Sequence, residues 1–152
     1  MSDDKREEIR TFISTRPPAV HAFMTTLKKD GQPYIRQVST FVEGWTINTV
    51  SRFTNLKMTH IRNNPLVTYM WVQSPSDYGA KNVWVQGEIE IVDDPAQVQA
   101  FLEHRASTQG NPIPAVQYDR LYLKLQPKFL RAEGFLGRQT PIFMRGDDFL
   151  DR

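Results

Sequence analysis

The sequence predicts a mainly β fold of the α+β class, a six- to seven-stranded antiparallel β-barrel with two or three short peripheral helices. Its 152 residues are enough for one domain with a single hydrophobic core. Segments that alternate between apolar and polar residues, as strands do, outnumber those with helical spacing. Turn signals join these segments in a mostly hairpin-like order, and closing such a sheet into a barrel removes its exposed edges.

The strands are expected in two groups. Residues 19–27 and 34–42 are rich in strand formers and flank a turn signal at 28–31, so they should pair as a hairpin. Residues 45–50 follow a second tight turn and complete a three-stranded meander. The later strands are expected at 66–72, 82–92, 121–125 and 129–135.

Three short helices are expected beside these strands. Residues 3–15 and 54–63 each show helical spacing of apolar residues after a residue that can cap a helix. Asp93, Asp94 and Pro95 open a third helix that runs to about residue 107. The C-terminal segment 136–152 shows no clear period, so the sequence assigns it no structure or role.

Composition excludes several function classes. The chain has no cysteine, which excludes disulfides, thiolate metal sites and cysteine nucleophiles. Its net charge is only +2 and its basic residues are dispersed, so no arm for nucleic acid is visible. The N-terminus is too charged for a signal peptide, and no segment approaches the roughly 18 apolar residues that span a bilayer. We expect a single cytoplasmic domain over residues 1–152 that binds neither nucleic acid nor membrane.

The histidines and tryptophans suggest structural roles. His21, His60 and His104 have no metal-ligand spacing, so we expect surface or helix-face residues and no metal site. Tryptophans on strands are typical of a core or a subunit interface. We expect Trp71 and Trp84 at an interface.

The most informative stretch of the chain runs from Phe23 to Val67. Its ordered features are hydroxylated residues on a strand, an Asp-Gly turn followed by Pro, an Arg-x-Val, a hydroxyl-rich strand end, a Lys that opens a helix, and an Asn-Pro. They are carried by Thr25, Thr26, Asp30, Gly31, Pro33, Arg36, Val38, Thr49, Ser51, Lys57, Asn64 and Pro65. Together with residues 82–88, this set resembles the pyridoxamine phosphate oxidase-like family of split β-barrels, whose members bind FMN or a related deazaflavin.

The resemblance implies a split β-barrel that holds FMN. The residues implied to bind the cofactor are Arg36, Gln37, Val38, Ser39, Thr49, Val50, Ser51, Arg52, Leu56, Lys57, Asn82 and Trp84. Arg36 is implied at the phosphate or ribityl end, and Asn82 at the ring or ribityl. The chain lacks the C-terminal Trp and Arg-Leu-x-Pro-type segment of the vitamin B6 oxidase, so we expect a relative of the short general-stress and deazaflavin-binding members instead.

The residues themselves also point to an anion site. Arg52 and Lys57 bracket the expected helix start, where unpaired N–H groups and the helix dipole favour an anion. Ser51, Thr54 and Asn55 add donors beside them. A flavin mononucleotide needs such donors for its phosphate and an apolar surface for its ring. Taken singly, each of these residues is equally typical of a solvated charge or a helix cap.

The expected function is that of an FMN-dependent oxidoreductase, with an unknown small-molecule substrate and unknown catalytic residues. A deazaflavin-dependent reductase and a non-enzymatic flavin- or haem-binding protein are the alternatives. We also expect a homodimer, because residues 69–72 and 83–85 are apolar on both faces of their strands. The alternative is that the helices at 3–15 and 95–107 cover those faces within one chain.

Overall fold

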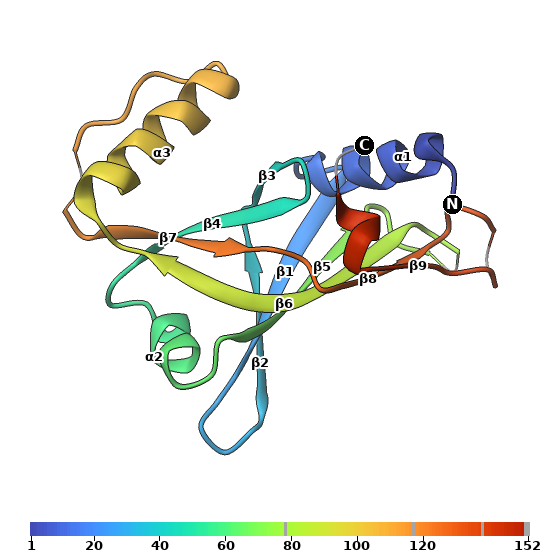
Figure 1. Cartoon of the computed structure of the whole chain (residues 1–152), viewed down its shortest axis with the longest axis horizontal. Helices are drawn as coiled ribbons and strands as arrows, with labels where there is room; N and C mark the ends of the chain where they lie inside the picture. The colour runs from blue at the N-terminus through green and yellow to red at the C-terminus, as the bar shows by residue number, and fades with distance from the viewer. Residues whose placement is uncertain (78, 117, 138, 151–152) are drawn as a thin grey trace.

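The computed structural model, which describes residues 1–77, 79–116, 118–137 and 139–150, shows an antiparallel sheet that curls into a half-barrel (Figure 1). Seven strands follow one another in the order β2-β1-β5-β6-β7-β4-β3, and β8 and β9 branch from β6. The expected mainly β split barrel is therefore confirmed. The strands are β1 (Val20–Leu27), β2 (Pro33–Val38), β3 (Phe41–Glu43), β4 (Thr46–Arg52), β5 (Leu66–Gln73), β6 (Asn82–Val92), β7 (Arg120–Leu125), β8 (Phe129–Glu133) and β9 (Ile142–Arg145).

The long strand β6 is where the sheet divides. One of its edges pairs with β5 over residues 82–88. Its other edge pairs with β8 over residues 82–86 and with β7 over residues 89–92. Gly87 lies at the division, where the chain that leads from β7 to β8 crosses so closely that a Cβ on Gly87 would lie 2.7 Å from the Gln126 carbonyl oxygen. A glycine is therefore required at the branch of the sheet.

The expected three-stranded meander is wrong, although its first hairpin is confirmed. β1 and β2 pair as predicted, with Thr25 opposite Ile35. The predicted strand at 34–42 is two strands, because the chain leaves β1 after Val38 and crosses to the other half of the sheet as β3. β4 consequently pairs with β3 and β7 and not with β2. Closure of the barrel, which no local pattern encodes, moves β3 away from the hairpin.

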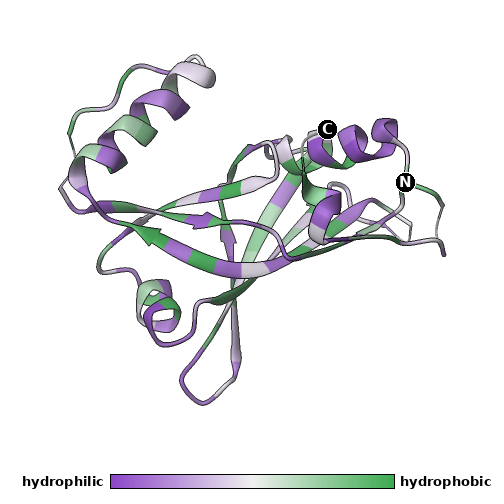
Figure 2. Ribbon diagram, in the orientation of Figure 1, coloured by the Kyte–Doolittle hydropathy of each residue, from purple (hydrophilic) through white to green (hydrophobic). Residues whose placement is uncertain are grey.

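The core fills the concave side of the sheet, and hydrophobic residues alternate with hydrophilic ones along the strands (Figure 2). Tyr69 is fully buried, and its hydroxyl lies 2.6 Å from that of Thr49, so this buried polar pair is satisfied. Burial raises the pKa of Tyr69. Trp71 is 1% exposed and donates its indole N–H to Thr40, so its expected place at an interface is wrong.

Three α-helices lie around the sheet, as predicted: α1 (Asp3–Ser14), α2 (Leu56–Asn63) and α3 (Pro95–Thr108), followed at the C-terminus by the short 3₁₀ helix η1 (Gly146–Phe149). Ser2 and Asp94 cap α1 and α3, as their sequence positions suggest. α3 packs Phe101 against Tyr122 of β7, while α2 packs against β1. Within the described part of the chain, no helix is both long and apolar enough to cross a membrane.

Candidate functional site

Two half-buried cations, Arg36 of β2 and Lys57 of α2, lie near each other beside β1. Burial lowers the pKa of Lys57, and the positive charge of Arg36 lowers it further. Burial likewise lowers the pKa of Arg36. Among the described residues, neither cation forms an ion pair with a carboxylate. Two like charges without a counterion are unfavourable in a partly desolvated place, which is the arrangement expected where an anion binds.

The Arg36 guanidinium is held in place on two sides. It lies over the ring of Tyr34, with 4.6 Å between its central carbon and the ring centroid. Its Nη2 donates to the hydroxyl of Thr26 at 2.8 Å. Its Nη1 is buried and has no hydrogen-bond partner within the described structure. This group is therefore an unsatisfied donor next to a second cation.

His60 completes the cluster from the helix. It is 7% exposed, and its Nδ1 lies 2.8 Å from the Thr26 hydroxyl. Burial lowers the pKa of His60, and the charges of Arg36 and Lys28 lower it further. His60 is thus a helix-face residue, as the sequence allowed, but one whose side chain is turned toward β1 and buried. Neither its role nor that of Thr26 was recognised from the sequence.

The other residues expected near the helix start have different environments. Arg52 is exposed, and its Nε lies 3.6 Å from Asp119. Ser51 is buried and accepts a hydrogen bond from the side chain of Asn55 at 3.3 Å. Thr49 points into the core. The structure therefore brings Arg36 and Lys57 together, whereas Arg52 has a carboxylate partner of its own.

A second group of expected residues lies on the opposite, outer face of the sheet. Side chains alternate along a strand, so Gln37 and Arg36 point to opposite faces of β2. Gln37, Phe23, Met70 and Trp84 are successive cross-strand neighbours, which places Gln37 and Trp84 in one outer row. Asn82 points to the same outer face. The remaining expected residues lie elsewhere and are half-buried or exposed: Leu56, Val50, Val38 and Ser39.

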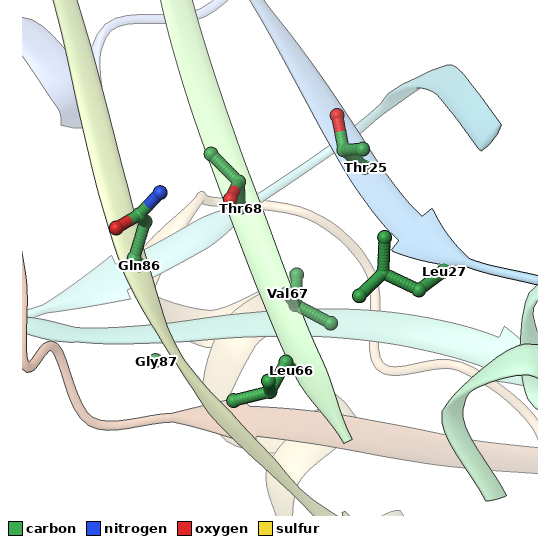
Figure 3. A pocket seen from close by; sticks show the side chains of 7 residues that line it. All are labelled: Thr25, Leu27, Leu66, Val67, Thr68, Gln86 and Gly87. Atoms are coloured by element: carbon green, nitrogen blue, oxygen red, sulfur yellow. The ribbon is translucent and has the colours of Figure 1, made fainter. Parts of the chain in front are cut away.

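A shallow hollow of about 270 Å³ lies on the outer face of the sheet, on the other side of β1 from the cation cluster (Figure 3). Its lining comes from β1, β5 and β6 and consists of Thr25, Leu27, Leu66, Val67, Thr68, Gln86 and Gly87. Leucine side chains and hydroxyl and amide groups together suit a flat, partly polar group. Thr25 lines the hollow, and the next residue on β1, Thr26, contacts Arg36 and His60, so the hollow and the cation cluster lie on opposite faces of the same strand.

The curled antiparallel sheet defines a split β-barrel, and the cation pair beside its first hairpin is a candidate anion site. The family model of pyridoxamine 5'-phosphate oxidase matches residues 6–132. The chain therefore belongs to this family. No curated protein sequence matches it significantly.

Solved structures with the same fold include three with named properties. General stress protein 26 from Bacillus anthracis str. Sterne is 19% identical with a TM-score of 0.68, over 92% of this chain and 97% of that chain. A protein named F420 reductase is 22% identical with a TM-score of 0.62, over 80% of this chain and 94% of that chain. A FAD-binding protein from Mesorhizobium loti is 19% identical with a TM-score of 0.65, over 88% of this chain and 94% of that chain. At these identities the likeness establishes the fold alone.

Proposed function

We propose that the protein binds FMN through its phosphate at Arg36 and Lys57 and acts as a flavin-dependent oxidoreductase on a small molecule. The observation that carries the proposal is the cation pair without a carboxylate, one member of which has a buried, unpartnered Nη1. A phosphate dianion beside the pair would neutralise both charges. Asn55, which precedes α2, makes no capping hydrogen bond with its side chain, so the first turn of α2 can also donate to the phosphate.

Membership of the pyridoxamine 5'-phosphate oxidase family supports a flavin as the group attached to the phosphate. A bound flavin supplies hydride or electron transfer, while the residues of the chain bind and orient it. Fold relatives are named for F420, for FAD and for haem, so they support a bound cofactor of either class.

The first test compares FMN with riboflavin, which lacks the phosphate. We expect the protein to bind FMN more tightly, and the change Lys57→Ala to weaken FMN binding roughly 10- to 150-fold because one charge-assisted contact is lost. Riboflavin binding should not change. Flavin fluorescence quenching measures both affinities, and Arg62→Ala, an exposed cation on the same helix, is the matched control.

Equal affinity of the protein for FMN and riboflavin would remove the phosphate site from the proposal. The absorbance spectrum of the protein as purified distinguishes the alternatives, because FMN, a deazaflavin and haem absorb at different wavelengths. A deazaflavin spectrum would mean that the longer, more acidic deazaflavin cofactor, and not FMN, binds at these cations.

We also propose that the outer face of the sheet is the interface of a homodimer. Its rows contain large apolar side chains that remain accessible, among them Ile35 at 64%, Leu66 at 49% and Phe143 at 52% exposure. The three helices pack elsewhere on the sheet. The hollow on this face is smaller than the roughly 300–1,000 Å³ of typical small-molecule sites, and a second copy would wall its open side.

We expect sedimentation to give a species with twice the 17.6 kDa mass of one chain. The change Phe143→Glu should dissociate this species into single chains. Phe143 lies opposite Arg131, and Arg131 lies opposite Trp84, so Phe143 belongs to the same outer row. A carboxylate buried there by a second copy would be unfavourable. Ile113→Glu is the control, since Ile113 is 70% exposed in the loop after α3. A single 17.6 kDa species of the unaltered, FMN-loaded protein at micromolar concentration would exclude the dimer.

A further inference from the structure

A short relay of hydrogen bonds connects the anion-binding Arg36 to a histidine on the neighbouring helix. Arg36 Nη2 lies 2.8 Å from Thr26 Oγ1, and the same oxygen lies 2.8 Å from His60 Nδ1. Arg36 Nη2 is also 3.5 Å from His60 Nδ1. Thr26 is fully buried, so water does not substitute for either partner.

The chemistry of the groups fixes the direction of the first bond, and the second depends on the tautomer of His60. A guanidinium can only donate, so Thr26 accepts from Arg36. The Thr26 hydroxyl has a single hydrogen, and the acceptor within reach is His60 Nδ1. In the arrangement that uses this hydrogen, His60 Nδ1 is unprotonated and the neutral imidazole carries its proton on Nε2.

We propose that Thr26 and His60 are positioning residues that, with His60 neutral, hold the Arg36 guanidinium in place beside the bound anion. The inference rests on the proposed function, because Arg36 is the residue that takes the phosphate there. Tyr34 supports the same placement: its ring lies under the Arg36 guanidinium and meets the His60 ring edge-on at 5.5 Å.

Protonation of His60 would disrupt this arrangement for two reasons. Nδ1 would become a donor, which leaves the hydrogen of the buried Thr26 hydroxyl without an acceptor. An imidazolium would also stand 3.5 Å from the Arg36 guanidinium. The groups that face His60 from β1 and β2 are Lys28, Tyr34 and Arg36, and its own helix contributes Lys57 one turn away, so the surrounding charges are positive. Burial and the positive charges of Arg36 and Lys28 all lower the pKa of His60.

The test is a pair of substitutions at Thr26, assayed with FMN and with riboflavin at pH 7.5. Thr26→Val keeps the shape and removes the hydroxyl, whereas Thr26→Ser keeps the hydroxyl. We expect Thr26→Val to weaken FMN binding about tenfold and Thr26→Ser to stay within about twofold of the unaltered protein. Riboflavin affinity should be the same in all three. Equal FMN affinities of the two variants would overturn the inference, whereas equal FMN and riboflavin affinities of the unaltered protein would instead overturn the phosphate site.

A second measurement on the unaltered protein does not depend on how the variants fold. The ¹⁵N chemical shifts of the His60 ring, assigned by comparison with His60→Gln, report its tautomer. We expect neutral imidazole with the proton on Nε2 at pH 7.5. A ring protonated on Nδ1, either as the other tautomer or as imidazolium, would overturn the relay.

Discussion

Replacing both cations, with Arg36→Gln and Lys57→Gln together, is expected to weaken FMN binding by more than about 100-fold. Each change removes a charge-assisted contact to the phosphate. Lys57→Gln alone should also raise the free energy of unfolding of the cofactor-free protein by about 0.5–1 kcal/mol. Stability rises while FMN affinity falls because, without an anion, burial and the charge of Arg36 both disfavour the charged form of Lys57. Flavin titration and urea unfolding measure the two effects.

The control for this experiment is a second double variant with the same change in net charge. Lys29→Gln with Arg62→Gln removes two exposed cations and should leave FMN affinity nearly unchanged. A similar loss in both double variants would mean that overall charge, and not the cation pair, attracts the cofactor. A cofactor-free Lys57→Gln protein that is less stable than the unaltered one would contradict the repulsion between Lys57 and Arg36.

The candidate site was only partly predictable from the sequence. Arg36 and Lys57 were predicted as ligands because they stand in an ordered pattern, and they do lie together. Thr26 was noticed as part of that pattern without a role, and His60 seemed to be one of three scattered histidines. The signal that joins them is the packing of α2 on β1, which places residues 34 positions apart at 2.8 Å. Such a contact is a property of the tertiary fold and leaves no local trace in the sequence.

The fold was more predictable, and each of its errors has a physical cause. Alternation identifies β6, β7 and β8, and strand-forming residues identify β1; each of these strands has one face in the core. It does not show that β3 leaves the hairpin, since partner choice depends on closure of the barrel. β9 lies in the segment 136–152, where only four residues form the strand and the period is too short to detect.

Gly87→Val is expected to destabilise the protein by more than the roughly 1–3 kcal/mol typical of an overpacked core, and Gly87→Ala by about that amount. A valine in a strand ordinarily stabilises relative to glycine, because it packs on neighbours and restricts the unfolded chain. Here the Cβ would lie 2.7 Å from the Gln126 carbonyl oxygen and 3.1 Å from the Leu125 side chain. The leucine can rotate, but the carbonyl belongs to the chain that crosses β6, so the crossing must shift.

Urea unfolding of the cofactor-free proteins measures the effect at Gly87, with Glu90→Val as the control. Glu90 is exposed on the same strand and gains the same side chain, so its stability should change by no more than about 0.5 kcal/mol. The series then separates strand propensity, which favours valine at both positions, from the backbone contact, which exists at Gly87 only. If Gly87→Val were as stable as the unaltered protein, the close crossing at Gln126 would not be what holds the two halves of the sheet at this branch.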